Sequence, residues 1–144
     1  MSPYRAKGHP PRRADVRPPP LVLVVQGDTD ARQMYAAMLA YSGMRVIESA
    51  MADDAFRKAH VLRPDIVATG IGLPGGNDGC QLCERLKSDR RTQAIPVIVV
   101  TAWVSGGHLE RARQAGCDSV LIKPCSPDVL LEEIQRLLRL ASDR

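Results

Sequence analysis

Five short apolar segments recur along the chain, and each is followed by a segment with helical character. Two of them, Leu21–Val25 and Val97–Val100, contain no polar residue. A strand without apolar–polar alternation is covered on both faces, which is typical of parallel sheets enclosed by helices. The strict alternation of strands and helices therefore predicts an α/β fold with a doubly wound parallel sheet and right-handed crossovers.

Turn and cap residues divide the chain into ten expected elements. The expected strands cover 21–25, 44–48, 66–69, 96–101 and 119–122, and the expected helices cover 28–41, 51–62, 79–89, 105–115 and 126–140. The last helix has the clearest start, because Ser126, Pro127 and Asp128 supply an N-cap, an N1 proline and an acidic first turn. The residues expected to face the core from the first two helices include Met34, Met38, Leu39, Ala55, Phe56, Ala59 and Leu62.

Residues 1–20 differ in composition from the rest of the chain. They include six prolines and carry the entire net charge of +4, because residues 21–144 hold 15 basic and 15 acidic side chains. Such a segment cannot bury enough apolar surface to offset its ordering entropy, so a disordered or polyproline-like tail is expected, with the domain at 21–144. Alternatively, the tail is a basic arm for an acidic partner, a membrane or nucleic acid. The balanced charge of the domain makes nucleic-acid binding there unlikely on electrostatic grounds.

No apolar stretch is long enough to span a membrane, and the N-terminus lacks the apolar region of a secretory signal. A cytoplasmic protein with reduced thiols is therefore expected. Cys80 and Cys83 form a C-x-x-C pair, but no second pair follows, and both fall where a helix needs core residues. Packing is favoured over metal binding or redox chemistry for these cysteines, and the three histidines show no ligand spacing.

Several short fragments occur in a fixed order along the chain: Leu21–Val25, Arg32, Pro64–Val67, Leu73-Pro74, Asp78-Gly79, Ile95–Ala102, Ala115–Asp118 and Lys123-Pro124. With these fragments in this order, the chain from Leu21 to Leu140 resembles the CheY-like receiver domain of response regulators. The resemblance implies strand order 2-1-3-4-5, a cis Lys123-Pro124 bond, and a site at the carboxyl edge of the sheet. Such domains accept a phosphoryl group from a histidine kinase onto an aspartate that ends the third strand, with Mg²⁺ held by that aspartate and an acidic pair.

Several positions of this family site carry other residues here. The resemblance places Gly70 at the phosphoacceptor position and Gln26 and Gly27 at the acidic pair, while Thr101 and Lys123 match the residues that bind phosphoryl oxygens. Val120 stands at the aromatic switch position. Glycine offers no nucleophilic oxygen, and Mg²⁺ prefers carboxylate oxygens, so phosphorylation and the Mg²⁺ site are both expected to be lost. Without its usual aspartate partner, Lys123 is expected to turn to solvent, reach Asp28 or hold an anion.

The interpretation favoured by these residues is a stand-alone pseudo-receiver, not an enzyme, that acts in two-component or phosphorelay signalling by protein–protein interaction. Its expected face comprises the helix at 105–115, the strand at 119–122 and the last helix, around Trp103, His108, Arg111 and Val120. A signalling protein such as a histidine kinase, or a second copy of the chain, is the expected partner.

Two other functions remain open at this point. One is a phosphorelay receiver with an unconventional acceptor such as Asp28. The other is a nucleotide-binding enzyme, because Gly70–Gly75 spells G-x-G-x-x-G after a strand. That motif would need a helix to begin inside it, whereas Pro74–Asn77 predicts a turn.

Overall fold

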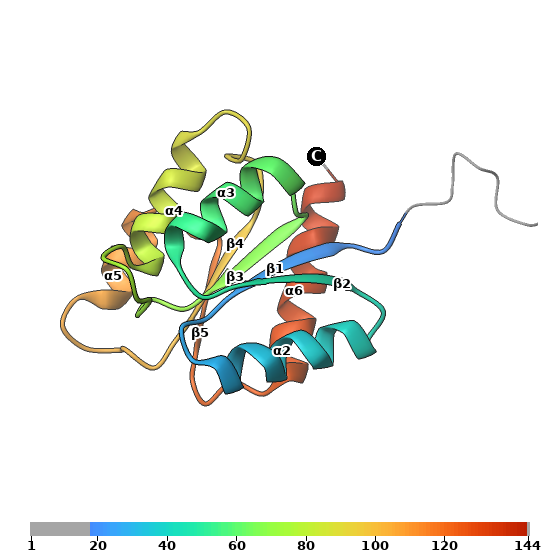
Figure 1. Ribbon diagram of the computed structural model, residues 1–144, viewed down its shortest axis with the longest axis horizontal. Coiled ribbons are helices and arrows are strands. Elements are labelled where there is room, and N and C mark those ends of the chain that lie inside the picture. Colours follow the sequence, from blue (N-terminus) through green and yellow to red (C-terminus); the bar gives the residue numbers. More distant parts are fainter. Residues whose placement is uncertain (1–17, 144) are drawn as a thin grey trace, which may run out of the picture.

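The computed structural model describes residues 18–143 and has a five-stranded parallel sheet at its centre (Figure 1). The strands are β1 (Leu21–Val25), β2 (Arg45–Ser49), β3 (Ile66–Thr69), β4 (Val97–Thr101) and β5 (Ser119–Ile122). They are ordered β2-β1-β3-β4-β5, which confirms the predicted order. Parallel pairing brings the carboxyl ends of β1, β3, β4 and β5 to one edge of the sheet.

Five helices cover the two faces of the sheet in the described part of the chain. They are α2 (Thr29–Tyr41), α3 (Ala52–Leu62), α4 (Gly79–Ser88), α5 (His108–Gln114) and α6 (Pro127–Ser142). Helices α2 and α6 contact each other on one face, while α3 contacts α4 and α4 contacts α5 on the other (Figure 1). This arrangement confirms the predicted doubly wound α/β fold.

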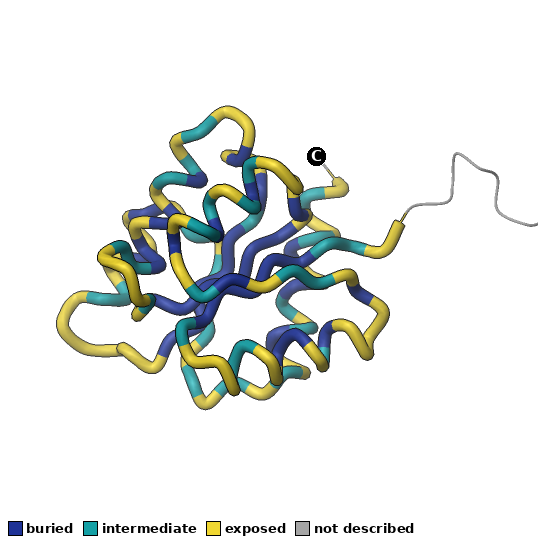
Figure 2. The backbone as a smooth tube through the Cα atoms, viewed as in Figure 1, coloured by how far each residue is buried: buried dark blue, intermediate teal, exposed yellow. Residues whose placement is uncertain are grey.

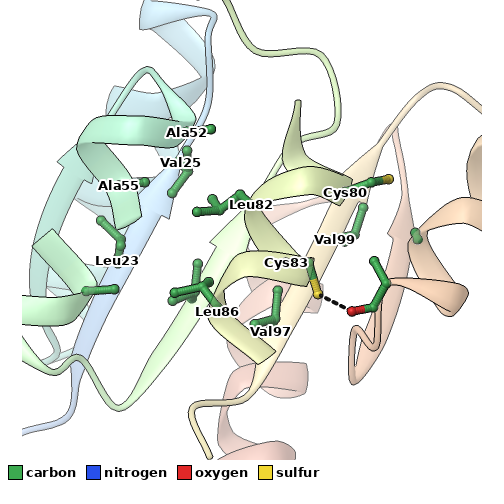
Figure 3. Close-up of a cluster of buried hydrophobic side chains, with 14 of the residues drawn as sticks. Leu23, Val25, Ala52, Ala55, Cys80, Leu82, Cys83, Leu86, Val97 and Val99 are labelled. Atoms are coloured by element: carbon green, nitrogen blue, oxygen red, sulfur yellow. Dashed lines mark hydrogen bonds between the residues drawn. The ribbon is translucent and has the colours of Figure 1, made fainter. Parts of the chain in front are cut away.

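The buried residues form two clusters, one on each side of the sheet, with exposed residues concentrated on the outer helix faces and loops (Figure 2). The cluster under α3, α4 and α5 includes Leu23, Leu82 and Leu86, all fully buried. Cys80 and Cys83 belong to the same cluster, and the Cys83 thiol donates to the carbonyl of Ala115 at 3.5 Å (Figure 3). The predicted packing role of this cysteine pair is confirmed.

Two predicted core residues are exposed instead. Met34 is 47% exposed because α2 turns Tyr35, Ala36 and Leu39 toward the sheet. Tyr35 is anchored there by donating its hydroxyl to the carbonyl of Cys125 at 3.0 Å. Because of this anchor, the inward face of the helix is shifted by one residue from the prediction.

Leu62 is 48% exposed, although a core position was predicted for it. It ends α3, and Arg63 beyond it adopts a left-handed conformation that turns the chain away.

The start of helix α5 also differs from the prediction, because the helix begins at His108 and not at Ser105. Gly106 and Gly107 both have positive φ angles there, and left-handed residues cannot continue a right-handed helix.

The chain before β1 contacts the sheet from Pro19 onward. The carbonyl of Pro19 accepts from Arg45 Nε, and that of Pro20 accepts from the Arg45 N–H, both at 2.9 Å. Residues 1–17 of the predicted tail lie outside the part of the chain that the structure describes. None of the helices within residues 18–143 has both the length and the apolarity needed to cross a bilayer.

Candidate functional site at the carboxyl edge of the sheet

A cavity of about 160 Å³ opens where the carboxyl ends of β1, β3, β4 and β5 meet. Its position agrees with the general rule that ligands bind at this edge of open α/β sheets, where the strand order reverses. The residues that line it are Gln26, Gly27, Asp28, Gly70, Ile71, Gly72, Val100, Thr101, Ala102, Trp103 and Lys123. The cavity therefore contains Gln26, Gly27, Gly70, Thr101 and Lys123 of the positions that the sequence assigned to the receiver site. Pro124 and Val120 do not line it.

The side chain of Gln26 lies against Gly70. A Cβ atom placed on Gly70 would be 3.1 Å from Gln26 Oε1 and 3.3 Å from Nε2. Gln26 is 95% buried, and its backbone carbonyl accepts from Arg32 Nη1 at 2.8 Å. The space beside the end of β3 is thus occupied by the amide of the residue that follows β1.

Lys123 reaches this amide from the opposite side of the cavity. Its Nζ donates to Gln26 Oε1 at 3.2 Å, and within residues 18–143 it forms no ion pair. Of the three expectations for this side chain, contact with Asp28 is therefore wrong, and the hydrogen bond to Gln26 was not foreseen. The Lys123-Pro124 peptide bond is cis, as predicted.

Asp28 lines the cavity, but one of its oxygens is engaged. Its Oδ2 accepts from the N–H of Ala31 at 2.8 Å and caps α2. An N-capping carboxylate satisfies a donor of the first helical turn, and this contact fixes the side chain toward the helix. The capping role gives no support to Asp28 as a phosphoacceptor.

Thr101 and Trp103 form the wall beside β4. The buried Thr101 hydroxyl accepts from the N–H of Trp103 at 2.9 Å. The indole of Trp103 lies over Gly72 so closely that a Cβ on Gly72 would be 2.7 Å from two of its ring carbons. The ring also packs against His108, with centroids 4.9 Å apart, so a glycine on one loop determines where the aromatic side chain of another can lie.

The four residues of the predicted interaction face do not form one cluster. Trp103 and His108 contact each other, and Trp103 is 49% exposed. Val120 is partly buried and packs against the core under α3–α5. Arg111 instead turns to α4, where its guanidinium contacts Asp78 at 2.8 Å.

Asp78 joins α4 to α5 through this contact. It caps α4 by accepting from the N–H of Gln81, whose side chain accepts in return from the N–H of Asp78. Partial burial acts to raise the pKa of Asp78, but the hydrogen bonds from Gln81 and Arg111 outweigh it and lower the pKa below its ordinary value.

The glycine motif does not lead into a helix. Gly75 and Gly76 have positive φ angles, and α4 begins only at Gly79, with its N-terminus capped by Asp78. A pyrophosphate site of the Rossmann type needs the free N-terminus of a helix next to the motif. This geometry counts against the nucleotide-binding hypothesis.

The cysteines and acidic residues likewise offer no metal centre within the described range. No group of three or more His, Cys, Asp or Glu side chains is placed there to hold an ion. Burial raises the pKa of Cys83 to about 12, so its thiol stays protonated at neutral pH.

Sequence reasoning missed two contacts that shape the cavity. One is the Gln26 amide, which fills the space at Gly70 and bonds to Lys123; the other is the packing of Trp103 over Gly72. Both join residues far apart in the chain. The sequence does place a glycine, Gly72, and a large side chain, Trp103, at the same predicted edge of the sheet. Only the fold shows that the two residues touch.

Comparison with known proteins identifies a family that this chain matches. Residues 22–135 match the response regulator receiver domain. The response regulator DivK of Brucella anthropi is 32% identical over 120 residues, which cover 83% of this chain and 97% of DivK. The transcriptional regulatory protein PhoB of Escherichia coli is 31% identical over 118 residues, covering 82% of this chain, and the chain spans about half of its length.

Solved structures agree with these relatives. A CheY-like receiver domain protein of Methanospirillum hungatei superposes with a TM-score of 0.81 at 26% identity, covering 87% of this chain and 98% of its own. The receiver domain of the sensor histidine kinase PA1611 of Pseudomonas aeruginosa, with a magnesium ion coordinated in its active-site cleft, gives 0.74 at 27% identity. Its match covers 88% of this chain and 99% of that domain.

Proposed function

The chain belongs to the response regulator receiver domain family, and we propose that it is a pseudo-receiver whose signalling does not depend on its own phosphorylation. Receiver domains are signalling modules that interact with proteins such as histidine kinases. In the proposed role this chain keeps the interaction and lacks the phosphoryl chemistry.

The observation that carries the proposal is the environment of Gly70. Phosphoryl transfer to a protein requires a nucleophilic oxygen, and glycine has none. The adjacent space is filled by the amide of Gln26, so no neighbouring carboxylate takes the place of the absent side chain. Asp28 is the one acid that lines the cavity, and its Oδ2 is used to cap α2.

The groups around the cavity also fit Mg²⁺ poorly. Mg²⁺ demands near-octahedral oxygen ligands and is usually bound by one or two carboxylates. Here the oxygen of Gln26 already accepts from the Lys123 ammonium, whose positive charge would repel a second cation at the same place. No step of the proposed function therefore involves the metal.

The surface proposed for the partner combines the loop before α5 with β5 and the start of α6. Large apolar side chains that are about half exposed there are Trp103, Val104, Ile122 and Val129. Tryptophan is among the residues that most often dominate the binding energy of protein interfaces, and surrounding contacts exclude water from such an anchor. A signalling protein such as a histidine kinase, or a second copy of this chain, is the proposed occupant.

A titration of the purified protein with Mg²⁺, acetyl phosphate and beryllofluoride tests the proposal. Because Trp103 lines the cavity, its fluorescence reports on any occupation of the site. We expect no change in fluorescence or in thermal stability at millimolar Mg²⁺, with or without a phosphoryl donor. The Brucella anthropi DivK protein, treated identically, serves as the comparison. A saturable Mg²⁺ response, or acid-labile phosphorylation of this chain, would refute the proposal.

A further inference from the structure

The ammonium of Lys123 is the starting point for a second proposal, which goes beyond the pseudo-receiver role. Lys123 is partly buried, lines the cavity, and forms no ion pair with any acid in the range 18–143. Its one side-chain partner there is the neutral oxygen of Gln26. A partly desolvated charge without an opposite charge is unfavourable, and an anion entering the cavity would relieve this cost.

Gln26, which also lines the cavity, adds a second donor. Lysine can only donate, so the atom it contacts must be the amide oxygen, and the NH₂ group is thereby fixed at the other end. In the described part of the chain this Nε2 has no hydrogen-bond partner, yet it is not sealed from solvent. A side chain that is 95% buried and lines the cavity therefore keeps an N–H donor without a partner among the described residues. A buried donor without a partner costs free energy, and a hydrogen-bond acceptor that occupies the site would remove this cost.

The remaining walls of the cavity are largely apolar. Ile71 and Val100 contribute aliphatic surface, and the indole of Trp103 closes one side where it lies on Gly72. At about 160 Å³ the cavity is well below the roughly 300 Å³ of the smallest drug-sized pockets, so it suits a molecule of a few atoms plus one ring. Two donors beside an apolar wall match a ligand with one anionic end and one apolar end.

We propose that this cavity reversibly binds a small organic monocarboxylate. The carboxylate accepts from Lys123 Nζ and Gln26 Nε2, and the apolar part lies against Trp103. A monoanion is favoured over a dianion for two reasons. Within residues 18–143, Lys123 is the one cationic residue that lines the cavity, and the negative charge of Asp28 in the same lining would repel a second negative charge on the ligand. Binding needs neither metal nor covalent chemistry, and it would make the pseudo-receiver responsive to a metabolite instead of to phosphorylation.

Benzoate is the probe, with benzamide as a neutral isostere, acetate as a ligand without a ring, and inorganic phosphate as a non-carboxylate anion. Affinities are measured at constant ionic strength by calorimetry and by Trp103 fluorescence. We expect benzoate to bind with a Kd on the order of 1 mM, and benzamide about tenfold more weakly or worse. Acetate and phosphate should also bind more weakly than benzoate, since one lacks the ring and the other the apolar contact.

Three variants assign the site. Lys123→Met should weaken benzoate binding about tenfold, whereas Lys123→Arg should retain most of it. Lys58→Met, which removes a partly exposed lysine of α3 that pairs with Asp54 and does not line the cavity, should leave benzoate binding unchanged and controls for net charge. Circular dichroism and thermal melting establish that each variant is folded.

Gln26→Glu provides the test that does not depend on loss of folding. It preserves the shape of the side chain but places a carboxylate on Lys123, so it should abolish benzoate binding while keeping or raising thermal stability. Equal affinity for benzoate and benzamide, equal affinity for benzoate and phosphate, or undiminished binding in Lys123→Met or Gln26→Glu would overturn the proposal. No binding of benzoate to the unmodified protein would do the same. None of these results bears on the pseudo-receiver role, which is tested by Mg²⁺ and phosphoryl donors.

Discussion

The two halves of the carboxyl edge of the sheet are built differently. Gln26, Gly27 and Gly70 follow strands β1 and β3, and backbone and amide groups pack closely there. Thr101, which ends β4, and Lys123, which follows β5, line the cavity on the other side. Across the cavity, the two halves are joined by the hydrogen bond from Lys123 to Gln26 and by the packing of Trp103 over Gly72. In the proposed pseudo-receiver, the half at Thr101 and Lys123 corresponds to the retained phosphoryl-binding positions, and the half at Gln26, Gly27 and Gly70 corresponds to the replaced metal-binding positions.

Restoring the replaced half should have the largest effect. We expect the triple change Gln26→Asp, Gly27→Asp, Gly70→Asp to create saturable Mg²⁺ binding and phosphorylation by acetyl phosphate, measured by Trp103 fluorescence and mass spectrometry. The shorter side chain at position 26 also makes the room that a Cβ at position 70 lacks beside Gln26. A Cβ at position 27 would be only 3.0 Å from Pro74 Cδ, so the metal-free variant should be less stable than the parent.

Two controls separate charge from shape in that experiment. Gly70→Asp alone should bind no Mg²⁺, because the other two carboxylates are still missing. The matched triple asparagine variant has the same size without the charge and should also give no response. Phosphorylation of Gly70→Asp alone would show that the β1 half contributes less than this comparison assumes.

The second largest effect concerns the close packing of the β3 half. A Cβ on Gly79 would lie 1.8 Å from the carbonyl oxygen of Gly70, which no rotamer can relieve because the clash is with backbone. We therefore expect Gly79→Ala to lower the free energy of unfolding by about 3 kcal/mol in a urea titration. Glu84→Ala, on the exposed face of the same helix, should change it by less than about 0.5 kcal/mol. A Gly79→Ala variant as stable as Glu84→Ala would mean that this loop is free to rearrange.

These contacts also indicate how far the sequence alone could lead. Continuous apolar strands such as Leu21–Val25 have one plausible environment, a sheet covered on both faces, so the parallel sheet and its covering helices were predictable. The strand order was predicted from the resemblance to receiver domains. The identity of the edge residues was equally accessible, because Gly70 follows directly from the end of a recognisable strand. What they contact was not accessible: Gln26 and Lys123 are 97 positions apart, and their hydrogen bond depends on side-chain directions that periodicity does not encode.

Errors in the helices have a similar origin. The apolar periodicity gave the correct length for α2 but not the rotation of the helix about its own axis. Either Met34 or Tyr35 could belong to an apolar face that packs on the sheet. The rotation is decided by a hydrogen bond to Cys125 on a distant loop. At α5, a pair of left-handed glycines overrode an otherwise acceptable helical pattern.

A third prediction concerns how the retained half holds its loop. Thr101→Val keeps the shape of the buried side chain but removes the acceptor of the Trp103 N–H. We expect a loss of about 1 kcal/mol in stability and a shift of the Trp103 emission toward that of exposed indole. Ser105→Ala, at an exposed position of the same loop, is the control. An unchanged emission spectrum would show that Gly72 alone is enough to position the ring.

The fourth prediction concerns how the stability that Glu133 contributes between α6 and β5 depends on pH, and its expected size is similar to that of the third. The hydrogen bonds from Arg136, aided by one from Ser119, lower the pKa of Glu133 from an ordinary 4.5 to about 2. A depressed carboxyl pKa stabilises the fold above about pH 4.5, and this contribution disappears as the pH falls through 2. We expect Glu133→Gln to cost about 1 kcal/mol at pH 7, since the pair is partly solvated, and to cost nothing near pH 2. A difference that stays constant with pH would mean that packing, not charge, holds α6 to β5.

The smallest effect should come from truncating the N-terminal segment, whose described residues 18–20 lead into the amino end of β1, at the opposite edge of the sheet from the cavity. Deletion of residues 1–17 should shift the unfolding free energy by less than about 0.5 kcal/mol, because this proline-rich stretch has no apolar periodicity to bury. Deletion of residues 1–20 should cost about 1 kcal/mol more, since it removes the carbonyls of Pro19 and Pro20 that accept from Arg45. The two truncations, compared by thermal melting, thus locate the start of the folded domain between residues 17 and 20. Neither should alter ligand binding at the carboxyl edge, and a truncation that does would place the segment in contact with the site.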